Sequence, residues 1–161
     1  MLLVSFVLSC YCKEGKWNKN EKEKTMRESL LLFNFKDKKQ LKGIQMTAFL
    51  LKMKVRMIEE KDFLMPLGYL AGVEGIEPSD TVFTGIAPEK EVMVFAGVSD
   101  AKLQRMLAEM RKNGIRKVDY KAVLTPTNIH WNVMELYEEL AKEHTAMQRR
   151  KNVHEDGQPE A

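Results

Sequence analysis

The chain has 161 residues, of which 44% are hydrophobic and 30% are charged, and its formal net charge is +3. These proportions are ordinary for a globular protein of one domain, and they exclude a fibrous or strongly charged disordered chain. A net charge this small neither requires nor excludes a nucleic-acid partner. The two cysteines, Cys10 and Cys12, lie close together near the start, so disulfide bonds cannot hold a core and we expect a cytoplasmic protein.

The first 25 residues combine an apolar run with a charged one. Residues 1–12 read MLLVSFVLSCYC and residues 13–24 read KEGKWNKNEKEK. No positive charge precedes the apolar run, as it would in a signal peptide, and the run is too short to span a bilayer. We therefore expect residues 1–25 to lie outside the fold as a disordered extension, with Met26 as an alternative start, and we expect no membrane partner.

The first half of the remaining chain predicts a strand, a helix and a second strand. Ser29–Phe35 is a short apolar run typical of a buried strand, and Asp37 is a suitable N-cap for the helix that follows. Residues 54–60 alternate apolar and charged, as in a strand near a sheet edge. A turn at Pro66 opens a helical segment, and residues 72–90, rich in Gly and Pro, predict an irregular connection. The buried stripe of the helix is predicted to be Leu41, Ile44, Ala48 and Leu51.

The second half predicts the same order of elements. Residues 91–98 form another apolar run, Ser99 caps a helix and Gly114 stands at its C′ position. Residues 117–125 alternate as a strand, and a turn at Pro126 follows. One face of this strand is predicted to carry Val118, Tyr120, Ala122 and Leu124, and the other Lys117, Asp119, Lys121 and Thr125.

The last helix begins with a recognisable N-terminal signature. Asn132 and Glu135 have the spacing of a capping box, and Trp131 and Leu136 have the spacing of a hydrophobic staple. No apolar periodicity continues toward the C-terminus, so we expect residues 148–161 to be a disordered tail.

These elements predict one α/β (α+β) domain over residues 26–147. It consists of two repeated strand–helix–strand halves, 29–72 and 91–147, joined by residues 73–90. The simplest arrangement is a ferredoxin-like four-stranded sheet with additional helices, in which the first strand of each half is central. Both faces of the central strands are apolar, so the third helix, the 63–72 segment or a second subunit must cover the face left open. The last of these alternatives would make the protein a homodimer.

The candidate site is the polar turn that precedes the last helix. A helix N-terminus attracts anions, and the side chains gathered near it suggest a site for a small anionic ligand such as phosphate or a carboxylate. The plainer interpretation is that Thr127 and Asn128 satisfy backbone groups of the turn while Lys121 is solvated. The candidate binding residues are Lys121, Thr125, Thr127, Asn128, His130 and Trp131.

Catalytic and metal-binding chemistry have little basis in the sequence. His130 and His144 are 14 positions apart and have no Cys, Asp or Glu constellation beside them. No nucleophile elbow or phosphate-binding glycine loop is present. We therefore expect no catalytic residue, no metal and no cofactor. The expected function is that of a binding or interaction module rather than an enzyme.

Two alternative functions remain. One is an unrecognised enzyme. The other is nucleic-acid binding through the aromatic residues Phe33, Phe35 and Phe95, which the balanced charge disfavours.

The run KAVLTPTN, followed by Trp131, LYEEL and then Glu143-His144, resembles a bacterial and archaeal family of unknown function, number 3783. The resemblance is most specific over residues 91–144. The upstream runs RESLLLFNF and DFLMPLGYLAGVEGIEP also resemble the first half of such proteins, so that most of residues 26–147 is covered. The resemblance implies no established activity.

Overall fold

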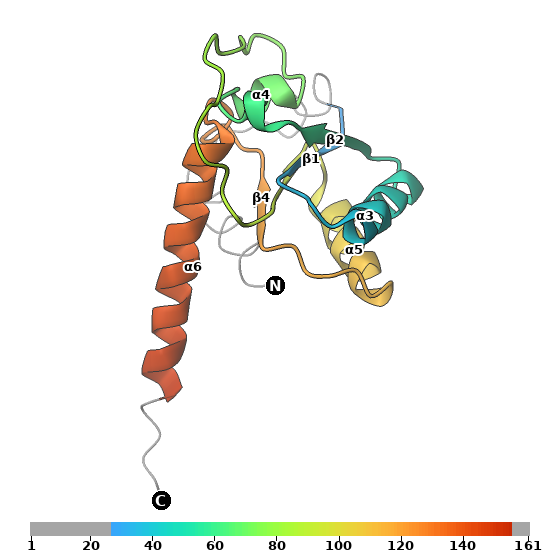
Figure 1. The fold of residues 1–161 in the computed structure, drawn as a ribbon. Coiled ribbons are helices and arrows are strands. Elements are labelled where there is room, and N and C mark those ends of the chain that lie inside the picture. The colour runs from blue at the N-terminus through green and yellow to red at the C-terminus, as the bar shows by residue number, and fades with distance from the viewer. Residues whose placement is uncertain (1–26, 156–161) are drawn as a thin grey trace, which may run out of the picture.

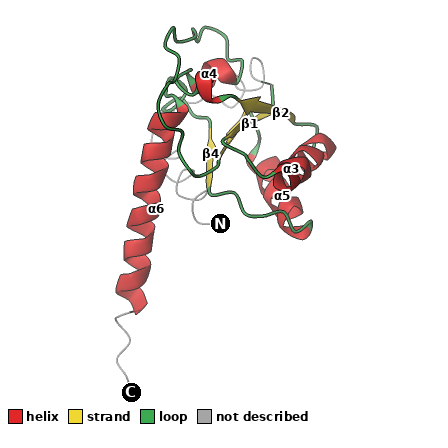
Figure 2. Ribbon diagram, viewed as in Figure 1, coloured by secondary structure: helices red, strands yellow, loops and turns green. Residues whose placement is uncertain are grey.

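The computed structural model describes residues 27–155, so the predicted extension 1–25 lies outside the described residues. The elements follow one another as β1 (Ser29–Phe33), α3 (Lys38–Leu50), β2 (Lys54–Ile58), the 3-10 turn η1 (Glu60–Asp62), α4 (Leu67–Leu70), β3 (Val92–Ala96), α5 (Asp100–Lys112), β4 (Tyr120–Val123) and α6 (Val133–Glu155). The predicted irregular connection is confirmed, because residues 73–90 contain neither helix nor strand. Figure 2 shows this connection as a long green loop.

The four strands form one mixed sheet in the order β2-β1-β3-β4. Within each half the two strands are adjacent and parallel, and the halves meet where β1 pairs with β3 in antiparallel register. The α/β class, the four strands and the central position of β1 and β3 are confirmed. The ferredoxin-like connectivity is not confirmed. In a ferredoxin-like sheet another strand lies between the two parallel strands of each βαβ unit, whereas here those two strands are adjacent.

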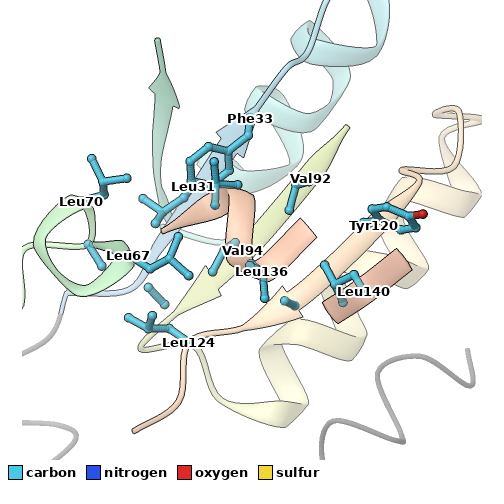
Figure 3. Packing of buried hydrophobic residues seen from close by; sticks show 14 of the residues in the cluster. Leu31, Phe33, Leu67, Leu70, Val92, Val94, Tyr120, Leu124, Leu136 and Leu140 are labelled. Carbon is cyan, nitrogen blue, oxygen red and sulfur yellow. The ribbon is translucent and has the colours of Figure 1, made fainter. Parts of the chain in front are cut away.

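The sheet is covered on both faces, which gives three layers (Figure 1). Alternate residues of the central strands enter two separate cores, as the apolar pattern of both faces predicts. The first core lies under α3 and α5 and takes Leu30, Leu32, Met93 and Phe95 from the central strands. The second core lies under α4 and α6 and takes Leu31, Phe33, Val92 and Val94 (Figure 3).

The second face is covered by segments of the same chain. Leu136 and Leu140 of α6 pack there beside Leu67 of α4. Phe63 contacts Phe33 edge-on at a centroid distance of 5.9 Å and also packs against Phe83 of the connection at 5.6 Å. Of the three predicted covers, the third helix and the 63–72 segment are therefore both used, and the irregular connection adds to them.

The helices α3, α5 and α6 begin, and α5 ends, where the local sequence predicts. The Asp37 and Ser99 side chains accept hydrogen bonds from backbone N–H groups in the first turns of α3 and α5. Asn132 Oδ1 accepts from Glu135 N at 3.0 Å, and Glu135 Oε2 accepts from Asn132 N at 2.9 Å, which is a complete capping box. Gly114 has a φ of 65°, the left-handed conformation expected just past the end of α5.

Two boundaries differ from those predicted. The strand predicted over residues 117–125 is shortened to Tyr120–Val123, because its partner β3 begins only at Val92, which pairs with Tyr120. Val118 therefore lies outside the strand alternation and packs in the first core, not with Tyr120 in the second, so its predicted side is wrong. At the C-terminus α6 continues to Glu155, beyond the predicted domain end at 147, through residues with high helix propensity.

Candidate functional site

The turn after β4 uses its own polar side chains to bind its own backbone. Thr125 N donates to Asn128 Oδ1 at 2.8 Å, and Asn128 N donates to Thr125 Oγ1 at 3.3 Å. Asn128 Nδ2 donates to Val123 O at 3.0 Å. Both side chains are buried, so their hydrogen-bonding groups face the turn and not an incoming ligand. This is the structural role that the plainer interpretation assigns to Asn128.

The turns at Pro66 and Pro126 contact each other, and protein atoms fill the point of contact. Leu67 N donates to Trp131 O at 2.7 Å and Gly68 N donates to Ile129 O at 2.8 Å. A Cβ atom on Gly68 would lie 2.6 Å from Ile129 Cγ1. The contact between the turns is therefore direct backbone packing, which leaves little room for a ligand at this point.

The remaining turn residues point in different directions. Thr127 and His130 are exposed to solvent, whereas Trp131 is half-buried and packs against the second core. The structure thus brings Thr125 and Asn128 together, but His130 and Trp131 do not complete a common pocket with them.

Lys121 lies on the opposite face of the sheet from the second core. Its β4 neighbours Tyr120 and Ala122 belong to the second core, so the alternation of the strand directs Lys121 toward α5. There it lines a cavity of about 160 Å³ between α5 and the chain leading into β4. The residues lining this cavity are Gln104, Leu107, Met110, Arg111, Ile115, Lys117, Val118 and Lys121.

The Lys121 ammonium group is buried, and within residues 27–155 it donates one hydrogen bond although it has three N–H donors. Lys121 Nζ donates to Val118 O at 3.0 Å, and the residue is only 9% exposed. Burial lowers the pKa of Lys121 below the ordinary lysine value, the charge of Lys117 lowers it further, and Asp119 opposes both effects. A buried ammonium group with free donor capacity at the edge of a cavity favours an anionic hydrogen-bond acceptor.

The sequence did predict Lys121 as a candidate, but not the side chains that surround it. Leu107, Met110 and Ile115 were predictable only as parts of an apolar helix face and its exit loop. Their position around one lysine depends on how α5 docks on the sheet. The alternation of residues 117–125 places Lys121 on the face opposite Tyr120 and Ala122, but it does not show that α5 covers that face.

A second polar cluster joins three distant segments and was not predicted. Gln40 Nε2 donates to Glu91 Oε2 at 3.0 Å and to Arg116 O at 3.1 Å. Arg116 Nη2 donates to Gln40 Oε1 at 2.9 Å and also pairs with Glu91 Oε1. Gln40 and Glu91 are buried and hydrogen-bonded to one another and to Arg116, so the cluster fixes the start of α3, β3 and the approach to β4. No local sequence signal links these three residues.

Within residues 27–155, no group of three or more His, Cys, Asp and Glu side chains is placed to hold a metal ion. No helix in the same part of the chain combines the length and the apolar character needed to cross a membrane.

Comparison with known proteins yields one match. Residues 91–147 match the model of a family described as Domain of unknown function (DUF3783). The second half of the chain is similar to that family. The resemblance seen in the sequence is therefore confirmed from β3 into α6, a segment that contains Lys121, the cavity and the turn. No curated protein and no solved structure matches the chain.

Proposed function

We propose that this domain is a non-catalytic binding module for a small carboxylate with an apolar body. The ligand would occupy the cavity between α5 and β4, with its carboxylate at Lys121. The observation that carries the proposal is Lys121, which lines an otherwise largely apolar cavity and whose ammonium group is buried. The anionic ligand expected from the sequence is retained, but its position moves from the Thr125–Asn128 turn to the other face of the sheet.

The size of the cavity suits a small ligand. A volume of about 160 Å³ is close to that of cavities of roughly 150 Å³ that accept benzene. Leu107, Met110, Ile115 and Val118 supply apolar contacts on the walls. A ligand the size of benzoate or a short branched-chain acid fits these walls.

The charges around the cavity favour an anion over a neutral ligand. Arg111, Lys117 and Lys121 all line it, and its lining includes no acidic side chain. A carboxylate would accept hydrogen bonds from the Lys121 ammonium group and offset the cost of burying that charge. Arg111 and Lys117 are exposed, so they would attract the anion to the entrance without holding it firmly.

The aromatic residues considered for stacking on nucleic-acid bases are buried. Phe33 and Phe95 are 1% and 0% exposed and Phe35 is 9% exposed, each inside one of the two cores. Aromatic rings in these positions do not present a face to a base. The basic residues near the end of α5 remain, but they are accounted for by the cavity entrance.

The proposal is tested by calorimetric titration with three probes: benzoate, benzyl alcohol and inorganic phosphate. Benzoate combines the apolar ring with a carboxylate, while each of the other probes lacks one of these features. We expect saturable binding of benzoate and at least about tenfold weaker binding of both controls, because loss of one charge-assisted hydrogen bond costs about 1.5–3 kcal/mol.

The matched variants are Lys121→Met and Lys112→Met. Lys112 ends α5 and is exposed, and it does not line the cavity. We expect Lys121→Met to abolish the preference for benzoate over benzyl alcohol and Lys112→Met to leave it unchanged. Equal affinity of the wild-type protein for all three probes, or no binding of benzoate, would contradict the proposal.

A further inference from the structure

An exposed apolar patch lies on the outer face of α3. Phe49 is 76% exposed, Leu50 is 69% exposed and Met46 is 56% exposed. Met57 on the edge strand β2 is 49% exposed, and its sulfur lies 3.9 Å from Gln45 Nε2 of α3. These four residues, Met46, Phe49, Leu50 and Met57, are called the α3 patch below.

The helical repeat explains why α3 presents these side chains outward. Ile44, Thr47 and Ala48 are buried against the sheet. Residues 46, 49 and 50 lie on the opposite side of the same turns, because successive residues are rotated by about 100°. Figure 1 shows α3 at the outside of the molecule, with the sheet on its inner side. The patch is therefore convex and stands clear of the two cores.

The segment that carries the patch has only positive charges. Residues 38–58 contain no Asp or Glu. Four exposed lysines stand before and after the apolar side chains of α3, at Lys38, Lys39, Lys42 and Lys52. A basic helix whose outer face also carries Phe, Leu and Met is typical of a segment that binds at a membrane interface.

We infer that the α3 patch docks on an anionic membrane surface. Phe49 and Leu50 enter the boundary between headgroups and acyl chains, Met46 and Met57 lie beside them, and the lysines bind acidic headgroups. The inference does not depend on a ligand in the cavity, and it departs from the expectation of no membrane partner drawn from the sequence. It describes binding to one leaflet, not insertion across a bilayer.

Charge favours this occupant over a second copy of the chain. Two α3 patches facing one another would bring two sets of lysines together, and like charges at an interface are repulsive. An anionic membrane surface has the opposite charge and attracts the same lysines.

Vesicle sedimentation tests the inference. The full chain is mixed with vesicles of phosphatidylcholine alone and with vesicles that also contain phosphatidylserine. We expect binding to the phosphatidylserine vesicles, at least about tenfold weaker binding to phosphatidylcholine alone, and a decrease as salt is added. The variant Phe49→Ser/Leu50→Ser should lose at least about tenfold in vesicle affinity.

The matched control is Ile86→Ser. Ile86 is 94% exposed but belongs to the irregular connection, so its loss should leave vesicle binding unchanged. Circular dichroism checks that both variants fold. Lys42→Glu/Lys52→Glu supplies a second test that leaves the apolar side chains in place, and it should weaken binding to the phosphatidylserine vesicles. Absence of vesicle binding overturns the inference, as does equal binding by the Phe49→Ser/Leu50→Ser variant. Concentration-dependent dimerisation that this variant abolishes would assign the patch to a second copy and overturn it equally.

Discussion

Asn128 is the residue on which the turn after β4 depends. Its amide group binds Thr125 N and Val123 O at once, and both contacts are buried. Lys121, seven positions earlier in the chain, has the opposite character, because it holds a charge in a buried position. Asn128 therefore satisfies buried backbone groups, whereas Lys121 carries a charge that is costly to bury, and the proposed function depends on that charge.

Replacing Asn128 with Ala should destabilise the protein by about 1–3 kcal/mol, because buried backbone groups lose their partners. Chemical denaturation followed by far-UV circular dichroism measures the change. The control Thr127→Ala alters an exposed neighbour in the same turn and should stay within about 0.5 kcal/mol of the wild type. Equal effects of the two substitutions would show that the hydrogen bonds of Asn128 do not stabilise the turn.

Replacing Lys121 with Met should raise the free energy of unfolding at neutral pH by roughly 1 kcal/mol, because a buried charge is removed. In the wild type the pKa of Lys121 is lower in the folded than in the unfolded state. The cost is therefore fully present below the lowered pKa, and it is relieved as the pH rises through that value toward the ordinary one.

Denaturation between about pH 7 and about pH 10 measures this dependence. The stability advantage of Lys121→Met over the wild type should shrink as the pH rises. A difference that stays constant over this range would mean that the folded and unfolded states hold the Lys121 proton equally well.

At the scale of elements, the helices were largely predictable and their docking was not. The caps at Asp37, Ser99 and Asn132 depend on neighbours within three residues, so the sequence alone indicates them. The length of β4 depends on where β3 begins, and the side taken by Val118 depends on that length. The cavity and the Gln40–Glu91–Arg116 cluster arise from contacts between distant segments, so neither could be predicted from local patterns.

Gly68 shows how closely α4 docks on the turn after β4. A Cβ atom there would lie 2.6 Å from Ile129 Cγ1 and 2.9 Å from Ile129 O, which is backbone. Gly68→Ala should therefore cost about 2 kcal/mol. Gly43→Ala is the contrasting substitution, because its Cβ would meet only the half-buried Ile115 side chain, at 2.9 Å, and alanine favours the interior of α3.

Thermal unfolding of both glycine variants separates these two situations. Gly68→Ala should lower the melting temperature by several degrees, and Gly43→Ala should change it little or raise it. If Gly68→Ala were tolerated as well as Gly43→Ala, the close backbone approach of the two proline turns would not contribute to stability.

At the scale of the whole molecule, the sheet separates two surfaces with different roles. On the second face, α4, α6 and the irregular connection pack closely and satisfy the polar turn, so the reason for expecting a second subunit on that face is removed. On the first face, α5 leaves a cavity beside the buried lysine. The anion-binding site predicted at the turn after β4 is thus proposed for the opposite face of the sheet, beside α5.

The most direct test of this account is to map benzoate on the ¹⁵N-labelled protein by amide chemical shifts. We expect saturable amide shifts that cluster at residues 104–121, with the shifts of residues 125–131 unchanged. Shifts centred on 125–131 would return the ligand to the polar turn and contradict the assignment to Lys121 and the α5 face.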